Sequence, residues 1–394
     1  MKLLYICTYR FKVLDNVVYT KPAYGDSFWD QFIDSFDRVD VLGEPFKKED
    51  SGILLAPLTR KDVHIDIIPS NSRISDFKND SIVKEKLYAS IKDSDCVLIK
   101  IASRKAIMAI NIAKQLNKPY MIGVTGDLYR DLRTSSSIFR RLYAPIIYRQ
   151  TLKAIKDCKF GTYVTDNYLQ SVYPISGEMC GYTDTILPYL DETILEKRIE
   201  KINNKKREDY FDLGIIGTYH DNRKGYDTAI LALQMVGNPK LRLRILGIGT
   251  KDDQNKWIEF GHKYKVEEIY FDKPVSGVEN VFKWIDAIDV CLLPSRSEGL
   301  PRCIVEAISR ACPCIISNVC GMPELVNNEW LHDPEDWKKL AELIIRMSSS
   351  TDILIQSAKE NFAKAHNYTM DVVRKKRMAF FDRFIKYSLL QNNE

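Results

Sequence analysis

Short apolar runs alternate with amphipathic stretches along most of the chain, in two successive cycles. The first cycle contains runs at 3–7, 39–42, 63–68, 96–101, 120–124 and 162–164. The second cycle contains runs at 211–217, 241–247, 269–271, 290–293 and 314–317. Buried strands separated by amphipathic helices are typical of parallel sheets that helices cover on both faces. The sequence therefore predicts an α/β fold with two doubly wound, Rossmann-like domains.

The length of 394 residues suits two domains of ordinary size. We expect residues 1–187 to form the first domain and residues 205–368 the second. Residues 188–204 are predicted to be a linker, because the sequence there becomes polar and charged and has little to bury. A long helical pattern follows at about 370–394. It carries Phe380, Phe381 and Phe384, and such an apolar stripe indicates core packing.

Composition narrows the class of protein. The chain is 45% apolar and 28% charged, as in soluble globular proteins, and no run approaches the roughly 18 apolar residues of a membrane-spanning helix. The first residues are expected to form a buried strand and not a signal peptide, so we expect a cytoplasmic protein. The formal net charge of +5 gives no reason to expect a nucleic-acid partner. The nine cysteines lie mostly in apolar runs and are expected to be reduced core residues.

Two carboxylates follow the strand-like run at 290–293. Glu298 lies in a Ser/Gly/Pro loop, and Glu306 follows with seven residues between them, inside the helix that the loop opens. Such a helix start leaves free backbone N–H groups and a positive dipole end, which suit a phosphate or a sugar oxygen. Carboxylates accept hydrogen bonds from hydroxyls, so the pair indicates a nucleotide sugar. A capped helix with an exposed glutamate is the alternative that the spacing alone leaves open.

This run resembles the E-x7-E signature of retaining glycosyltransferases with the GT-B fold, in the GT4 family (glycosyl transferases group 1). The next strand and the turn Gly321-Met322-Pro323-Glu324 resemble the segment that follows in that family. The resemblance covers the C-terminal half closely and the first half loosely. It implies two Rossmann-like domains facing across a cleft and a C-terminal helix that crosses back to the first domain. The subgroup that it indicates makes bacterial capsule, exopolysaccharide and O-antigen.

A basic turn follows the strand that ends at Gly217. After Thr218 come Arg223, Lys224 and Gly225, just before a predicted helix. Lys224-Gly225 matches the family's Lys-Gly diphosphate clamp, whose positive charge would neutralise the departing diphosphate. The family tends to place an arginine at the position of Thr218, and Arg223 is the candidate substitute. A solvated basic turn is the alternative, but the position between other matching motifs favours the clamp.

Two further segments resemble the donor site of the family. Gly247 ends the strand at 241–247 in a glycine turn, and Lys273-Pro274 follow the strand at 269–271, where the base of the nucleotide packs against backbone in the family. Because main-chain groups contact the base there, the sequence does not distinguish uracil from guanine. We expect a UDP-sugar, and a GDP-sugar stays open. A dinucleotide fingerprint is excluded, because its third glycine is absent.

The resemblance assigns roles to these residues. Glu298 would contact hydroxyls of the donor sugar, Glu306 those of the ribose, and Lys224 with Arg223 the diphosphate. N–H groups at the start of the helix would assist, near Gly299, Leu300 and Pro301.

The sequence thus predicts a retaining glycosyltransferase that moves a sugar from a nucleotide diphosphate to a glycan or lipid-linked glycan in surface polysaccharide biosynthesis. Neither a cofactor nor a metal ion is expected. The alternatives are a non-catalytic partner subunit that binds sugar nucleotides, and a hydrolase or epimerase of the same fold.

The first half offers two candidate features. Asp127 follows the run at 120–124, where many relatives carry a histidine, and is either a contact for the reacting sugar or the N-cap of a helix beginning near Leu128. The stretch from Arg130 to Lys156 carries seven cationic side chains among Ile, Leu and Tyr residues. It could lie on an anionic membrane at the inner face of the plasma membrane, or form an ordinary helix with its apolar stripe turned inward.

Overall fold

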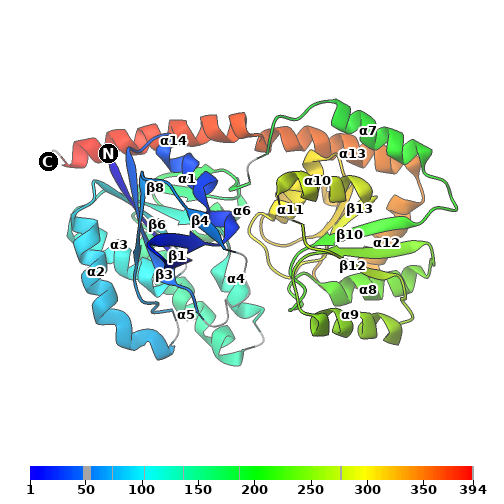
Figure 1. Ribbon diagram of the computed structural model, residues 1–394, viewed down its shortest axis with the longest axis horizontal. Coiled ribbons are helices and arrows are strands. Elements are labelled where there is room, and N and C mark those ends of the chain that lie inside the picture. Colours follow the sequence, from blue (N-terminus) through cyan, green and yellow to red (C-terminus); the bar gives the residue numbers. More distant parts are fainter. Residues whose placement is uncertain are drawn as a thin grey trace. The chain divides into compact units, whose positions relative to one another are not determined.

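The computed structural model describes residues 1–47, 55–72, 74–101, 103–135, 137–185, 187–275 and 277–392. The chain divides into two compact units (Figure 1). Unit 1 contains Met1–Tyr182 together with the chain from Arg374 onward, and unit 2 contains Thr183–Val373. The division confirms an α/β fold with two domains, and it assigns the end of the chain to the first of them.

Nine described strands form one sheet in unit 1. Its parallel part has the order β5-β3-β1-β6-β7-β8-β9. All six runs predicted for this half of the sequence lie in these parallel strands. The strands are β1 (Lys2–Leu14), β3 (Arg38–Pro45), β5 (Val63–Ile67), β6 (Cys96–Lys100), β7 (Tyr120–Val124), β8 (Phe160–Tyr163) and β9 (Glu178–Gly181).

Strand β1 belongs to two arrangements at once. Its first half, Leu3 to Ile6, is fully buried between β3 and β6. Its second half, from Phe11 to Leu14, forms an antiparallel hairpin with β2 (Val17–Thr20), and β2 pairs in turn with β4 (Ala56–Leu58). The turn residues Asp15 and Asn16 have positive φ, a conformation that Asp and Asn tolerate well in two-residue hairpins.

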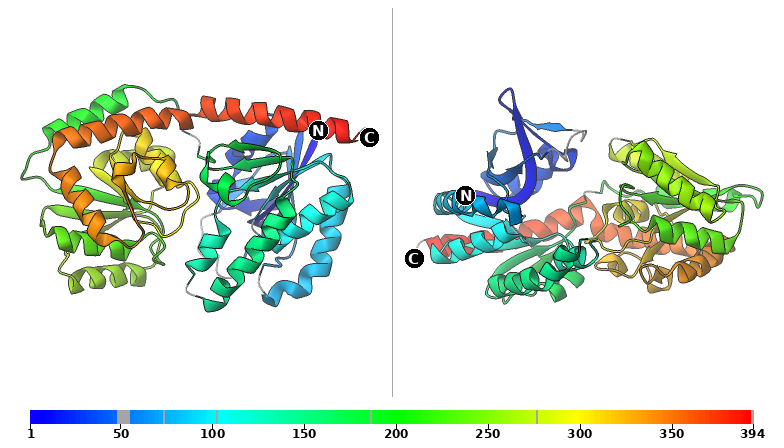
Figure 2. Two further views of the ribbon diagram at one scale, coloured as in Figure 1. Left: turned by 180° about the vertical axis from the view of Figure 1, so that it is seen from behind. Right: turned by 90° about the horizontal axis from the view of Figure 1, so that it is seen from below.

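Helices cover both faces of this sheet. Helices α2, α3 and α5 lie on one face, and α1 lies on the other beside the last helix of the chain (Figures 1 and 2). The helices of unit 1 are α1 (Asp26–Ile33), α2 (Asp80–Lys92), α3 (Arg104–Gln115), α4 (Leu128–Arg133), α5 (Ile138–Ile155) and α6 (Tyr168–Val172).

Helix α14 (Met370–Asn392) returns the end of the chain to unit 1. Its three fully buried phenylalanines form ring contacts with α1 and β8: Phe381 lies 6.0 Å from Phe32, and Phe384 lies 5.4 Å from Phe160, between ring centroids. Burying an aromatic side chain stabilises by roughly 1.5–3 kcal/mol, so Phe380, Phe381 and Phe384 hold α14 firmly. The apolar stripe predicted from the sequence is therefore core, and the predicted return to the first domain is confirmed.

The sheet of unit 2 has six described strands in the order β12-β11-β10-β13-β14-β15, all parallel. Helices α8, α9 and α12 cover one face, and α7, α10, α11 and α13 cover the other (Figure 1). The strands are β10 (Phe211–Ile216), β11 (Leu241–Leu246), β12 (Ile269–Asp272), β13 (Val290–Leu293), β14 (Cys314–Ser317) and β15 (Leu331–His332). The helices are α7 (Thr193–Asn204), α8 (Tyr226–Val236), α9 (Lys251–Lys263), α10 (Val278–Ala287), α11 (Arg302–Ser309), α12 (Trp337–Ser348) and α13 (Thr351–Ala365).

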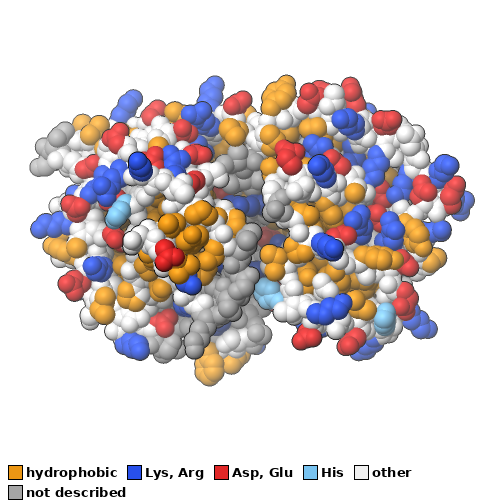
Figure 3. Space-filling model, in the orientation of Figure 1, with side chains coloured by type: hydrophobic (Ala, Val, Ile, Leu, Met, Phe, Trp, Pro, Cys, Tyr) orange, Lys and Arg blue, Asp and Glu red, His pale blue; other side chains and the backbone are white. Residues whose placement is uncertain are grey.

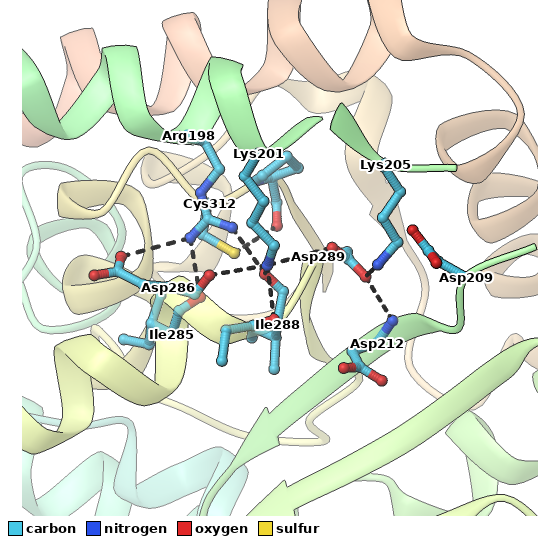
Figure 4. Close-up of polar contacts among 12 residues, drawn as sticks. Arg198, Lys201, Lys205, Asp209, Asp212, Ile285, Asp286, Ile288, Asp289 and Cys312 are labelled. Atoms are coloured by element: carbon cyan, nitrogen blue, oxygen red, sulfur yellow. Dashed lines mark hydrogen bonds and ion pairs between the residues drawn. The ribbon is translucent and has the colours of Figure 1, made fainter. Parts of the chain in front are cut away.

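The stretch expected to be a linker differs from that expectation. Most of residues 188–204 form α7, which packs within unit 2 against α13. Arg198 is only 3% exposed, and its guanidinium donates to the carbonyl oxygens of Ile285 and Ile288 (2.9 and 2.8 Å), at the C-terminal end of α10 (Figure 4). Lys201 donates to the same helix end, at Ile288 (2.6 Å). Two cations thus satisfy carbonyls that a helix end leaves without partners.

All nine cysteines are buried and none forms a disulfide, which agrees with the expected reduced core residues. Within the described part of the chain, no helix combines the length and the apolar character that crossing a bilayer requires.

Candidate functional site

The predicted donor residues gather at one edge of the unit 2 sheet. The strands β10 and β13 are parallel neighbours, so the loops that follow them emerge side by side. The β10–α8 loop carries Lys224, and the β13–α11 loop carries Glu298. The carboxyl ends of parallel strands are where open α/β sheets bind ligands. The backbone N–H of Arg296 donates to the carbonyl of Arg223 (2.9 Å) and joins the two loops directly.

An ion pair forms the centre of this edge. Lys224 Nζ lies 2.6 Å from Glu298 Oε1, and both side chains are about 15% exposed. Ser295 Oγ donates to the same oxygen at 2.9 Å, and Oε2 of Glu298 has no hydrogen-bond partner among the described residues. Burial alone would lower the pKa of Lys224, but the neighbouring Cys303 and Glu298 outweigh it and hold the pKa above its usual value. The lysine is therefore a fixed positive charge at neutral pH.

Two glycines make room for this pair. Gly217, at the end of β10, lies under the stem of Lys224: a Cβ there would approach Lys224 Cε to 2.7 Å. Gly225 has φ +72°, and its Cβ would meet the carbonyl oxygen of Pro294 at 2.0 Å. Only glycine fits at position 225 without moving the backbone, and this explains its place directly after the lysine.

The N-terminus of α11 faces the same edge. Pro301 is the N-cap, and its carbonyl accepts from the N–H of Ile304 (3.1 Å). The carbonyl of Gly299 accepts from the N–H of Gly321 (3.2 Å), so the Gly-x-Pro-Glu turn supports the loop of Glu298. Leu300 lies between them and is half-buried. The first N–H groups of α11 have no partner within the helix, as at any helix start.

Glu306 lies in the second turn of α11. Its carboxyl is largely buried and has no hydrogen-bond partner among the described residues. Burial raises the pKa of Glu306 to about 7, although the positive charge of Arg302 one turn earlier acts in the opposite direction. A poorly solvated carboxylate of this kind gains most from hydroxyl donors supplied by a ligand.

Arg296 connects three segments around the pair, and sequence reasoning missed it. Its guanidinium donates to the carbonyl of Asn222 (2.7 Å), to Asp227 (2.9 Å) and to Glu335 (2.7 Å). These contacts hold the chain on both sides of Lys224. The only sign of this role in the sequence was the position of the arginine, two residues before Glu298. Its partners could not be predicted, because they are distant in sequence and one of them is a backbone carbonyl.

The remaining donor candidates lie around the pair at the same sheet edge. Thr218 and Gly247 follow β10 and β11, and their backbones are close together: a Cβ on Gly247 would meet the carbonyl oxygen of Gly217 at 1.8 Å. Arg223 is exposed, and no ion pair of its guanidinium occurs among the described residues. Lys273 and Pro274 follow the outer strand β12 and are exposed.

Asp127 belongs to unit 1 and is buried. It is the N-cap of α4, where its side chain accepts from the N–H of Arg130 (3.2 Å). Two tyrosines also donate to its carboxylate, Tyr168 at 2.7 Å and Tyr173 at 3.1 Å. The N-cap interpretation is confirmed, and both oxygens are already hydrogen-bonded. A catalytic role for Asp127 stays a prediction.

Comparison with protein families agrees with the geometry of unit 2. Residues 210–350, which contain the Lys224–Glu298 pair and Glu306, match the family described as "Glycosyl transferases group 1". Over nearly its whole length the chain is 29% identical to protein CapJ of Staphylococcus aureus, covering 95% of the chain and 93% of CapJ. It is 28% identical to the colanic acid biosynthesis glycosyltransferase WcaL of Escherichia coli, over 39% of the chain and 40% of WcaL.

Solved structures share the fold of this chain. Sucrose-phosphate synthase of Thermosynechococcus elongatus aligns with a TM-score of 0.68 at 13% identity, over 98% of this chain and 99% of that one. Anabaena HepE, in complex with UDP and glucose, aligns with a TM-score of 0.64 at 14% identity, over 99% of both chains. The GT-B fold expected from the sequence is confirmed.

The raised pKa of Glu306 predicts that nucleotide binding depends on pH. Ribose hydroxyls would donate to the ionised carboxylate, so affinity should fall as the pH drops below about 7. Glu306→Gln should weaken binding by about 1.5–3 kcal/mol at pH 8, the scale of a lost charged hydrogen bond, and by less at pH 6. Calorimetric titration with UDP or GDP at both pH values measures this. The phosphate of the nucleotide also changes its charge between these pH values, but it does so equally with the wild type and with Glu306→Gln. The difference in affinity between the two proteins therefore reports on the Glu306 carboxyl.

The raised pKa of Glu306 also makes the free energy of unfolding depend on pH. A carboxyl with a raised pKa in the folded protein destabilises it above that pKa, and the cost disappears as the pH falls from about 7 to 4.5. Glu306→Gln should therefore increase the free energy of unfolding at pH 8, by up to about 3 kcal/mol at 1.36 kcal/mol per pKa unit. At pH 5 the gain should be small. Equal effects at both pH values would contradict the assignment.

Proposed function

We propose that this chain is a glycosyltransferase that moves a sugar from a nucleotide diphosphate donor, most favourably a UDP-sugar, to a glycan or lipid-linked glycan during bacterial surface polysaccharide biosynthesis, with retention of the anomeric configuration. The observation that carries the proposal is the half-buried Lys224–Glu298 ion pair at the carboxyl ends of β10 and β13. It places a fixed cation and a hydrogen-bond acceptor side by side at the edge where α/β sheets bind nucleotides.

Each group has a distinct part in donor binding. Lys224 turns from Glu298 towards the diphosphate, and exposed Arg223 adds a second positive charge. Glu298 accepts a hydroxyl of the donor sugar through Oε2, the oxygen left open by Lys224 and Ser295. Glu306 accepts the ribose hydroxyls, which would stabilise its ionised form.

For the proposed retention, the way Glu298 is held favours a route without a covalent sugar intermediate. Ser295 donates to its Oε1 also when Lys224 has turned to the diphosphate, and a hydrogen-bond donor makes a carboxylate a poorer nucleophile. A covalent sugar intermediate on Glu298 is therefore disfavoured. Instead, Lys224, Arg223 and the α11 N-terminus stabilise the departing diphosphate, and the acceptor hydroxyl attacks from the same face as the leaving group.

The relatives support the donor and acceptor classes. HepE has been solved in complex with UDP-glucose, and an E. coli relative that is 36% identical over 21% of this chain is named as a galactosyltransferase that uses UDP-Gal and GlcNAc-diphosphoundecaprenol. WcaL is named for colanic acid biosynthesis. By similarity to these relatives, we propose a nucleotide sugar as the donor and a glycan on a lipid diphosphate as the acceptor.

The direct test is a panel of UDP-, GDP- and ADP-sugars. Slow release of nucleoside diphosphate in the absence of acceptor, with one donor preferred, supports a transferase. Product analysis by NMR then separates the alternatives: an epimerase returns an altered sugar, and a partner subunit binds donor without turnover. Release that survives Lys224→Ala together with Glu298→Gln would place the chemistry elsewhere.

Turnover is expected to be independent of divalent metal. The described residues contain no group of three or more His, Cys, Asp or Glu side chains that could hold a metal ion, and lysine and arginine can neutralise the diphosphate instead. Donor hydrolysis in excess EDTA should match the untreated rate within about twofold. Loss of activity that Mn²⁺ or Mg²⁺ restores would contradict this, and Mg²⁺ added without EDTA treatment serves as the control.

A further inference from the structure

Helix α5 exposes a row of large apolar side chains. Phe139 is 77% exposed, Leu142 65%, Ile146 52% and Ile138 50%. Their spacing of three and four residues places them along one side of the helix, over more than two turns. Figure 3 shows apolar side chains at the lower edge of unit 1, where Figure 1 has α4 and α5. The ordinary interpretation of the sequence, with the whole apolar stripe turned inward, is therefore incomplete.

The opposite side of α5 holds the helix in place. Ala144 and Ile147 are buried against Leu132 of α4, and Thr151, Ala154 and Ile155 continue the buried side. The exposed row consequently belongs to a well-anchored helix with two apolar sides. A second apolar side has no role in the core of unit 1.

Positive charge surrounds this exposed row, and negative charge is absent from it. Residues 132–156 contain six cations and no Asp or Glu. All six are exposed, and none forms an ion pair among the described residues. They are Arg133, Arg140, Arg141, Arg149, Lys153 and Lys156. Unpaired cations around exposed aromatic and aliphatic side chains are the features of a helix that lies in the headgroup region of an anionic bilayer.

We infer that α5 is a membrane-docking surface, on which Phe139, Leu142 and Ile146 insert between lipid headgroups while Arg141, Arg149 and Lys153 contact anionic lipids. The two attractions act together, and two weak signals are what stable membrane attachment requires. The inference does not depend on the donor chemistry of unit 2. It specifies where a lipid-linked acceptor would meet unit 1.

The combination favours a bilayer over other occupants of this surface. A second copy of the chain would bring six more cations to the same place, and like charges repel. A polyanion such as nucleic acid would satisfy the arginines but leave Phe139 and Leu142 in water. An anionic bilayer accommodates both kinds of side chain.

The experiment is co-sedimentation of the full chain with vesicles of phosphatidylcholine alone or mixed with phosphatidylglycerol. Each cation near an anionic surface strengthens binding roughly fivefold, so Arg141→Gln/Arg149→Gln/Lys153→Gln should weaken partitioning by about a hundredfold at low salt. Phe139→Ser/Leu142→Ser should weaken it about tenfold or more, and this loss should persist at high salt because apolar insertion is not screened.

Helix α2 of the same unit provides matched controls. Lys84→Gln/Lys86→Gln/Lys92→Gln removes the same charge from exposed positions, and Ile82→Ser removes a side chain that is 51% exposed. Both should leave partitioning within about twofold, and all variants should keep wild-type donor hydrolysis, which reports on unit 2 independently. The inference would be overturned if the wild-type protein did not bind anionic vesicles at low salt. It would also be overturned if the α2 variants partitioned onto vesicles as weakly as the α5 variants. Self-association that Phe139→Ser/Leu142→Ser abolishes would do the same.

Discussion

Replacing Lys224 by alanine is expected to lower the turnover number by on the order of a hundredfold or more, the range for loss of one preorganised electrostatic contact. The donor's affinity should change much less. Without donor, the charge of Lys224 is already paired with Glu298 at 2.6 Å, so bound diphosphate exchanges one anionic partner for another. As the diphosphate departs it gains negative charge, and only then does the lysine interact more strongly than before.

Three measurements separate this result from a folding defect. Steady-state kinetics with the preferred donor gives the turnover number, and calorimetry with the free nucleoside diphosphate gives affinity. Lys224→Arg keeps the charge and should recover part of the rate, whereas Lys263→Ala, an exposed lysine on α9, should change nothing. Thermal unfolding checks that Glu298 tolerates the loss of its partner. Near-normal turnover in folded Lys224→Ala protein would place the diphosphate contact elsewhere.

The second large effect concerns stability. Arg198→Ala is expected to destabilise unit 2 by about 3 kcal/mol or more, because each buried hydrogen bond to a charged donor contributes roughly 1.5–3 kcal/mol. The variant leaves the carbonyls of Ile285 and Ile288 without this donor at the end of α10. Lys201 stays within reach of Ile288 and limits the loss there.

Tryptophan fluorescence during urea unfolding measures this selectively, since four of the five tryptophans, at 257, 284, 330 and 337, lie in unit 2. The matched control is Lys197→Ala, the exposed preceding residue on α7, which should stay within about 0.5 kcal/mol of wild type. If Arg198→Ala behaves like Lys197→Ala, the bonds of Arg198 do not hold α7, and its other contacts, such as those of Lys201, attach it to unit 2.

Most of the parallel strands could be predicted, because a strand buried on both faces appears in sequence as a short continuous apolar run; β9 and β15 were not predicted. Helix α7 escaped prediction for the opposite reason. Its charged side chains suggest solvent, yet Arg198 is buried through bonds to backbone carbonyls almost ninety residues later. A pattern of side-chain polarity carries no information about distant main-chain acceptors. The hairpin of β1 and β2 was missed because one long strand continues beyond the apolar run from Leu3 to Cys7.

The candidate site could likewise be predicted only in part. Lys224, Glu298 and Glu306 lie in local motifs at fixed positions after strands, so the sequence was enough to bring them to one edge of the sheet. The direct contact of Lys224 with Glu298, and the support from Arg296, depend on how two loops pack and have no local pattern. The raised pKa of Glu306 likewise follows from burial, which its helical position alone does not determine.

The chain is synthesised from its amino end, so the aromatic residues of α14 are the last part of unit 1 to leave the ribosome. Phe32 and Phe160 emerge early and then lack their partners Phe381 and Phe384 while all of unit 2 is made. Unit 2 is continuous and can fold during that interval, as domains generally do. The domain that is begun first is thus completed last, and its aromatic face stays uncovered until α14 has been made.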